Sequence, residues 1–255
     1  MYADFEEQYR DARTELIRRG DSGLASLLET RSGWMLFNDP RVSLKPGRLY
    51  LVGFNPGDQH VDPEGPRDES LEWWVTQEAR LKHSYSSYLD EAAAAGGHQQ
   101  RVRDLLDRYG DGATREDRIR STFATNLYFF GTRKAEELAE YPPELINCWE
   151  YHKTFLEIVQ PEMIVCSGNG WRSAYSEVKR AVMADGRTIQ DLADRSVSST
   201  GRVKAFVCTP GWSAETRGTL VLGVPHLSRP FAPMEKLFAA MDEMVAEAQA
   251  EECSR

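Results

Sequence analysis

Three polar side chains that could act on a ligand lie at the ends of apolar runs, far apart in the chain. Asn55, Asn126 and His226 each come at, or just after, the end of such a run. An amide can donate and accept hydrogen bonds, and histidine can titrate or donate near neutral pH. If the apolar runs are neighbouring strands, the three groups would share one pocket for a polar ligand.

Each of these residues also has a purely structural interpretation. Asn55 precedes Pro56 and could simply start a turn. A buried amide at Asn126 needs hydrogen-bond partners, which the protein itself could supply. His226 stands in a loop, where a lone histidine is commonly solvated. The residue types alone therefore leave structural and ligand-binding roles open.

The elements that would position these residues are strands that alternate with helices. The run at 49–52 is almost wholly apolar, which is typical of a strand buried on both faces, and it ends at Gly53 before a Pro-Gly turn. Similar runs predict parallel strands at 48–53, 121–128, 162–167 and 219–224. A further strand-like run occupies 203–208.

Helical patterns separate the predicted strands. They lie at 2–19, 71–81, 99–109, 143–159, 171–184 and 233–250. This order predicts a three-layer α/β fold with a central, mostly parallel four-stranded sheet and helices on both faces. We expect a single domain, with a helical lead-in at 1–47, a core at 48–232 and a C-terminal helix at 233–255. Polar residues after parallel strands could then converge at one edge.

The composition is typical of a globular protein with a sizeable core. The 255 residues are 41% hydrophobic and 28% charged. No apolar run reaches the length of a membrane span, and the acidic N-terminus lacks a signal-peptide core. We therefore expect a cytoplasmic protein without a membrane partner, and a monomer as the working assumption. No Cys-x-x-Cys pair occurs, and Cys166 and Cys208 are expected to be buried, reduced thiols rather than metal ligands.

The charge is acidic overall but uneven. The net charge of −9 argues mildly against a nucleic-acid partner. The segments 114–134 and 202–233 nevertheless hold an excess of basic residues and could share a face, although ordinary charge scatter explains them equally well. Gly168-x-Gly170 lacks the rest of a phosphate-loop pattern. The remaining histidines are expected at the surface: His60, His83, His98 and His152.

Three short motifs, taken in order, resemble the active-site motifs of the uracil-DNA glycosylase superfamily. Gly-Phe-Asn-Pro-Gly at 53–57 resembles the first motif, in the form Gly-x-Asn-Pro-Gly of the mismatch-specific and single-strand-selective branches. His-Leu-Ser at 226–228 resembles the His-Pro-Ser motif near the end. Thr-Asn-Leu at 125–127 lies between them, where the superfamily has a strand-end asparagine. The resemblance covers about residues 48–232 and implies a glycosylase-like fold.

The resemblance implies base excision in DNA repair. Such enzymes flip a nucleotide into a pocket and hydrolyse the bond between base and sugar. The transition state carries negative charge on the leaving base, so a placed water and a donor toward the base are needed. By match of motif, Asn55 would position the water, His226 would stabilise the anionic base, and Asn126 would read the edge of uracil. The implied partner is DNA, and no metal or diffusible cofactor is implied.

Other motif positions would contact the base or the DNA backbone. They are Phe54 and Gly57 in the base pocket, Ser228 at a phosphate, and Arg229 or Phe231 as the wedge that fills the vacated stack. Phe54 and Trp73 are the candidates for the aromatic side chain that stacks on the base.

The sequence also departs from the family pattern. Leu227 replaces the proline of His-Pro-Ser, and Gly57 stands where another branch has the tyrosine that excludes thymine. Asn55 replaces an aspartate that can accept a proton. Two functions remain in view. One is a DNA glycosylase for uracil or a related deaminated or damaged base. The other is a catalytically weak or inactive glycosylase-fold protein that binds a nucleobase, nucleotide or nucleic acid.

Overall fold

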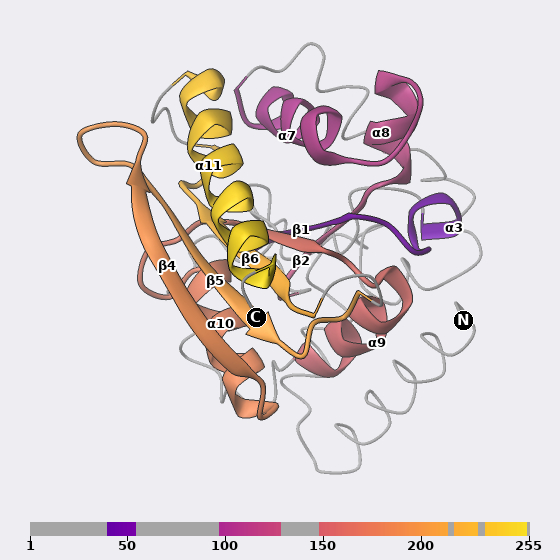
Figure 1. Cartoon of the computed structure of the whole chain (residues 1–255). Helices are drawn as coiled ribbons and strands as arrows, with labels where there is room; N and C mark the ends of the chain where they lie inside the picture. Colours follow the sequence, from indigo (N-terminus) through magenta and orange to yellow (C-terminus); the bar gives the residue numbers. More distant parts are fainter. Residues whose placement is uncertain (1–39, 55–96, 129–147, 214–216, 229–232, 254–255) are drawn as a thin grey trace, which may run out of the picture.

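The computed structural model describes residues 40–54, 97–128, 148–213, 217–228 and 233–253. Its centre is one six-stranded sheet (Figure 1). Four strands are parallel, namely β1 (Leu49–Gly53), β2 (Phe123–Asn126), β3 (Met163–Ser167) and β6 (Thr219–Val224). The sheet continues with two antiparallel strands, β5 (Arg202–Thr209) and β4 (Thr188–Ser196), in the order β2-β1-β3-β6-β5-β4.

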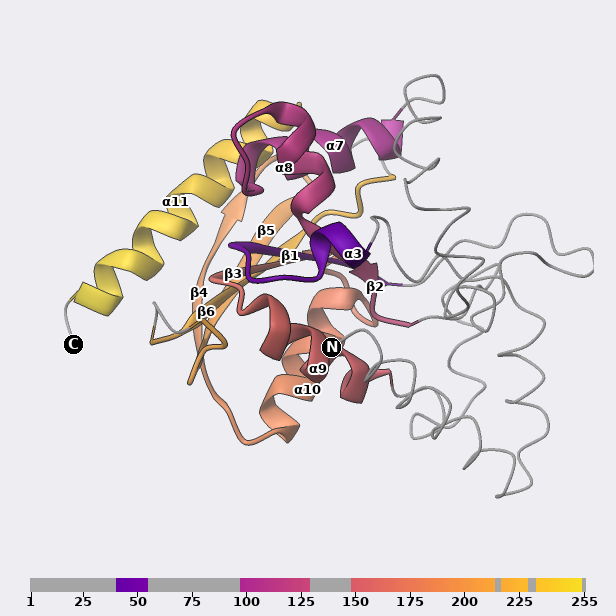
Figure 2. The same ribbon diagram turned by 90° about the vertical axis from the view of Figure 1, so that its right-hand side faces the viewer.

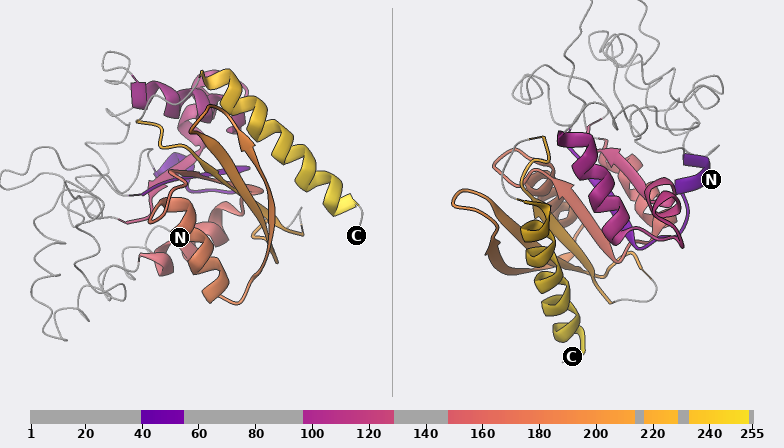
Figure 3. Two further views of the ribbon diagram at one scale, coloured as in Figure 1. Left: turned by 90° about the vertical axis from the view of Figure 1, so that its left-hand side faces the viewer. Right: turned by 90° about the horizontal axis from the view of Figure 1, so that it is seen from above.

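Helices cover both faces of the sheet, so the fold has three layers (Figure 2). One face carries α9 (Trp149–Val159) and α10 (Ala174–Ala184). The other face carries α7 (Gly97–Tyr109), α8 (Arg115–Ser121) and α11 (Met234–Cys253). Figure 3 shows α11 on the side of the sheet opposite α10. A short helix, α3 (Pro40–Ser43), precedes β1.

The side chains of β1 explain why both faces need a cover. Tyr50 and Val52 pack in the core cluster that includes α9 and α10, whereas Leu49 and Leu51 pack in the cluster that includes α7, α8 and α11. Each of the four is 1% exposed. A strand with apolar residues at successive positions is stable between two layers, as the run at 49–52 predicted.

The four predicted parallel strands are confirmed, but the prediction of a four-stranded sheet is wrong. β5 pairs with β6 and β4 pairs with β5, which adds two strands at one edge. The apolar run at 203–208 predicts β5 as a strand but not its place in the sheet. β4 has no apolar run because it is an edge strand in which only Leu192 is buried. Its pairing is also irregular between Leu192 and Arg195.

The second parallel strand is shorter than predicted because a helix occupies its expected beginning. Thr114 Oγ1 accepts from the Asp117 N–H at 3.0 Å, and the Asp117 carboxylate accepts from the Thr114 N–H at 3.2 Å. This reciprocal capping box satisfies two donors at the start of α8. The helix places Ile119 in the core, and β2 begins only at Phe123.

The other helices predicted within the described residues are confirmed with shifted ends. α7 begins at 97 instead of 99, α10 begins at 174 instead of 171, and α11 extends to 253. The helices expected at 2–19 and 71–81 lie outside the described residues. Cys166 and Cys208 are free and buried, as predicted, and so is Cys148. Among the described helices, none is both long and apolar enough to cross a membrane.

Candidate functional site

Gly53 and Phe54, the described part of the first predicted motif, meet the second motif at the carboxyl edge of the parallel strands (Figure 2). Gly53, at the end of β1, pairs with Asn126, at the end of β2. The pairing continues past both strands, because the Leu127 N–H donates to Gly53 O at 2.8 Å and the Tyr128 N–H donates to Phe54 O at 2.9 Å. The segment that would carry the water-positioning residue therefore leaves the sheet beside the segment that would read the base.

The third motif leaves the same edge next to the loop after β3. Ser167 pairs with Val224 at the ends of β3 and β6, and the Gly168 N–H donates to Val224 O at 2.9 Å. Gly168 has a φ of 106°, in the region that favours glycine. A Cβ built on Gly168 would lie 3.6 Å from His226 Cδ2, so the imidazole lies against this loop.

Asn126 and Phe54 have different surroundings at this edge. Asn126 is 3% exposed, so its amide is buried at the end of β2. Phe54 is half-buried, and its ring meets that of Tyr128 edge to face with centroids 5.1 Å apart. Burial, with a smaller contribution from the Glu177 carboxylate, raises the pKa of Tyr128 to about 12. Tyr128 directly follows the asparagine motif but was not among the predicted site residues.

A buried hydrogen-bond chain supports the end of β2 from inside the core. His152 Nε2 lies 3.0 Å from the backbone oxygen of Leu127, and His152 Nδ1 lies 2.7 Å from the hydroxyl of Tyr50. A carbonyl only accepts, so Nε2 carries the proton and donates, and the Tyr50 hydroxyl donates to Nδ1. The chain therefore holds the backbone next to Asn126.

Burial shifts the pKa values of His152 and Tyr50, and it shows that one prediction is wrong. His152 is 1% exposed, so its expected surface position is wrong. Its helix turns it inward between Trp149 and Phe155, whose rings both lie with centroids 6.0 Å from the imidazole. Burial lowers the pKa of His152 to about 4, although its bonds to backbone carbonyls act in the other direction. Burial also raises the pKa of Tyr50 well above its usual value.

The predicted catalytic histidine, His226, is exposed and has its ring orientation set by Ser228. Nδ1 of His226 lies 3.3 Å from the Ser228 N–H nitrogen and 2.6 Å from the Ser228 Oγ. A backbone N–H only donates, so Nδ1 is an acceptor, and the neutral ring carries its proton on Nε2. The geometry thus makes His226 a hydrogen-bond donor through Nε2.

The start of α7 holds this loop in place. Its His98 ring stacks on His226 with centroids 6.0 Å apart and an angle of 15° between the planes. Arg101 donates from one terminal nitrogen to Leu227 O at 2.7 Å. Burial lowers the pKa of His98 to about 4, with the neighbouring His226 as the next cause. The surface position predicted for His98 is therefore wrong, since it is half-buried in this cluster.

Leu227, which replaces the proline of the family motif, has a structural role. Its side chain is fully buried in the cluster that includes α7 and α11. Its N–H donates to Ser167 Oγ at 3.3 Å. The loop is thus anchored by an apolar side chain and two hydrogen bonds instead of a proline ring. No local signal in the sequence marks His98 and Arg101, because their partners lie in the distant loop after β6.

Several predicted site residues fall outside the described residues. They are Asn55, Gly57, Trp73, Arg229 and Phe231, together with His60 and His83. Their roles stay predictions. The structure therefore brings Phe54 together with Asn126 on one part of the edge, and His226 with Ser228 on another part.

The predicted basic segment at 114–134 forms ion pairs where the structure describes it. Arg115 lies 3.2 Å from Asp104, and Arg118 lies 2.6 Å from Asp107. Arg120 pairs with a glutamate of its own helix. These contacts join α8 to α7 and neutralise much of the positive charge, so ordinary charge scatter describes this segment better than a free basic face.

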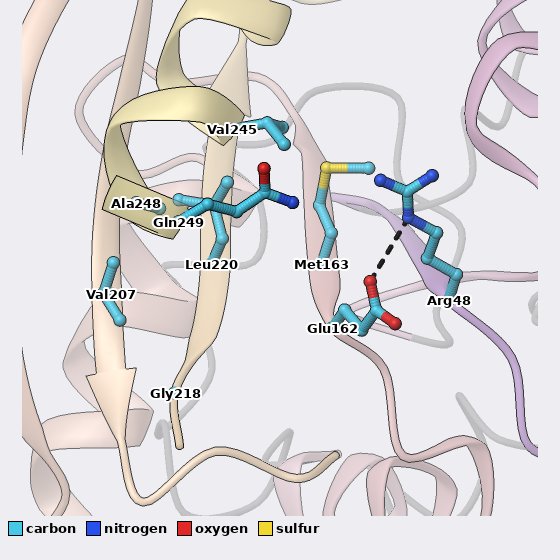
Figure 4. Close-up of a pocket in the computed structure, with 9 residues that line it drawn as sticks. All are labelled: Arg48, Glu162, Met163, Val207, Gly218, Leu220, Val245, Ala248 and Gln249. Atoms are coloured by element: carbon cyan, nitrogen blue, oxygen red, sulfur yellow. Dashed lines mark ion pairs between the residues drawn. The ribbon is translucent and has the colours of Figure 1, made fainter. Parts of the chain in front are cut away.

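A hollow of about 60 Å³ lies at the opposite edge of the parallel strands (Figure 4). Arg48 and Glu162, which directly precede β1 and β3, line it and form an ion pair at 3.3 Å. Val245 and Gln249 of α11 close another side. This space can hold a few waters but not a nucleobase, so it does not compete with the carboxyl edge as a site.

Within the described part of the chain, no group of three or more His, Cys, Asp or Glu side chains is placed to hold a metal ion. The comparisons with protein families, with curated proteins and with solved structures find no match to this chain. The residues of the carboxyl edge are therefore the features that point to a function.

Proposed function

We propose that this protein is a DNA glycosylase that hydrolyses the N-glycosidic bond of uracil or a related deaminated or damaged base. The observation that carries the proposal is the orientation of His226. Ser228 donates to Nδ1, so the neutral ring presents a proton on Nε2 at the carboxyl edge of the sheet. A fixed donor of this kind is what a leaving base needs as it becomes anionic.

Groups on another part of the carboxyl edge would supply the other parts of the reaction. When the bond between the sugar and the base breaks, its electron pair goes to the base, water adds to the sugar carbon, and the proton that the water loses ends on the released base. Asn126, which ends β2, offers an amide donor and acceptor for the edge of uracil. Its pairing with Gly53 places it beside the strand that leads to Asn55, the proposed water-positioning residue.

The charge distribution favours a second candidate, a glycosylase-fold protein that binds a nucleobase or nucleotide without cleaving DNA. The chain has a net charge of −9, and Arg115 and Arg118 are paired with carboxylates. A protein that binds a long polyanion usually presents unpaired positive charge. This candidate uses the same edge and the same asparagine.

The deciding experiment is an incubation of the wild-type chain with labelled oligonucleotides that contain one uracil, one hypoxanthine or only normal bases. Single-stranded and duplex forms are compared, and alkaline cleavage reports abasic sites. The proposal expects cleavage at the altered base only. Retention of the base in every substrate would reject the glycosylase and favour the binding protein. Met183→Ala, which changes an exposed side chain of α10, controls for contaminating activity if it is purified in parallel with His226→Ala.

A further inference from the structure

The loop that follows β3 presents a tryptophan to solvent. Trp171 is 85% exposed, whereas the other exposed large apolar side chains of the described residues, Val42 and Met183, are 44% and 54% exposed. Tryptophan has the largest apolar surface of any residue and is usually mostly buried. Such exposure therefore indicates a surface that contacts another molecule.

The loop beneath Trp171 is firmly anchored. The side-chain amide of Asn169 donates to the backbone oxygens of Arg202 at 2.5 Å and Gly223 at 2.8 Å. On the other side of the tryptophan, Ser173 Oγ donates to Gly170 O at 2.7 Å and also caps α10. The exposed ring thus projects from a fixed backbone, which lowers the entropy that binding would cost.

An arginine covers the ring and supplies positive charge. The Arg172 guanidinium carbon lies 4.6 Å from the centroid of the Trp171 ring. Arg172 is itself exposed, and among the described residues it forms no ion pair. A ring backed by an unpaired guanidinium suits a ligand that combines a flat base with a phosphate.

A second tryptophan–arginine pair has a structural role within the protein. Arg187 lies over Trp212 at 4.0 Å, but Trp212 is half-buried against the core. Arg187 also donates to the backbone oxygens of Pro210 and Gly211. Trp212 and Arg187 therefore stabilise a loop by contacts within the protein, whereas Trp171 and Arg172 face solvent.

The position of the exposed pair connects it to the candidate site. Gly168, three residues before Trp171, lies against His226, since a Cβ built on it would be 3.6 Å from the imidazole. We propose that Trp171 and Arg172 form a binding site for single-stranded nucleic acid, in which an unpaired base stacks on Trp171 and Arg172 contacts its phosphate. Only the placement of the neighbouring nucleotide at the carboxyl edge rests on the proposed function.

The test measures equilibrium binding of a labelled single-stranded DNA of about ten nucleotides to the full chain. A second probe of equal length has abasic sugars in place of the bases. Trp171→Ala should weaken binding of the first probe on the order of ten- to a hundredfold, as expected for the loss of one stacked base, and should hardly affect the second. Trp171→Phe should restore most of the affinity. Arg172→Ala should reduce the slope of log affinity against log salt concentration by the amount expected for about one lost phosphate contact.

Matched controls separate this site from general damage. Trp212→Phe and Met183→Ala should bind both probes like the wild type. Equal affinity of Trp171→Ala and the wild type, or no binding by the wild type, would overturn the proposal and assign the exposed pair to a protein contact. Trp171-dependent binding without base release would support this site while rejecting the glycosylase. Base release by the wild type, together with unchanged binding by Trp171→Ala, would support the glycosylase and reject this site.

Discussion

His152 and His226 have the same hydrogen-bonding arrangement in opposite surroundings. Each accepts a hydroxyl hydrogen bond at Nδ1, from Tyr50 or from Ser228, and therefore carries the proton of its neutral ring on Nε2. His152 is 1% exposed and donates to Leu127 O, whereas His226 is exposed at the carboxyl edge. Burial therefore separates the uses of the two imidazole donors: in the core the donor holds a strand end, and at the edge it can serve a ligand.

The largest effect is expected at Asn126, whose neighbour Leu127 is held by His152. In Asn126→Asp, a carboxylate oxygen replaces the amide donor and repels the uracil carbonyl, so uracil release should fall on the order of a hundred- to a thousandfold. Cytosine, whose exocyclic amine donates at that position, should become the better substrate. Single-turnover release of both bases is the measurement. A folded variant that loses uracil release without any gain for cytosine would remove Asn126 as the reader of the base edge.

Breaking the buried arrangement should cost stability. His152→Phe removes the donor to Leu127 and the acceptor for Tyr50, and leaves two buried polar groups without their partner. The expected loss is roughly 2–4 kcal/mol of unfolding free energy. Urea unfolding followed by fluorescence measures it. A variant as stable as the wild type would show that the chain does not support β2.

Acid should weaken the protein because buried histidines stay neutral when folded. The pKa of His152 is lowered to about 4, and that of His98 is lowered to about 4, from an unfolded value of 6.5. Between these values the unfolded chain binds more protons, so the contribution of these two histidines to stability should be constant above pH 6.5, fall as the pH drops toward 4, and change no further below it. Urea midpoints across this range test the trend. His152→Gln should reduce the slope by about half, and an unchanged slope would contradict the assignment.

The smallest effect is expected for Tyr50→Phe. This change keeps the buried ring and its contact with Phe123, whose centroid is 5.2 Å away, but removes the hydroxyl that donates to His152. The expected loss is about 1 kcal/mol, because His152 can still donate to Leu127. Thermal or urea unfolding beside the His152 variant measures it. A loss as large as that of His152→Phe would mean that the hydroxyl, and not the bond to Leu127, holds the strand end.

The parallel core could be predicted from the sequence because its strands are buried on both faces. Leu49 to Val52 shows this most clearly, since four successive apolar residues need two covering layers. The edge strand β4 gave no such signal, because its stability comes from pairing with β5 rather than from apolar side chains. The start of β2 was misplaced because the capping box at Thr114 favours a helix over the alternating pattern that follows.

The candidate site was predictable only where a motif marks it. His226 and Ser228 belong to one short motif, and their contact is local. His98 lies more than a hundred residues away in the sequence, and only the packing of α7 against the loop brings its ring onto His226. His152 was predicted at the surface because its partners, the Tyr50 hydroxyl of β1 and the backbone oxygen of Leu127 just after β2, lie far from it in the sequence. Long-range partners of this kind leave no local pattern.

Single-turnover release of uracil by the wild type and by His226→Ala tests the central claim most directly, with oligonucleotide affinity measured in parallel. His226 donates mainly to charge that develops in the transition state, so its loss should slow release on the order of tens- to a thousandfold while affinity and unfolding midpoint stay close to the wild type. Equal release by both proteins, or a loss of affinity that accounts for the whole change in rate, would contradict the role of His226 as the donor to the leaving base.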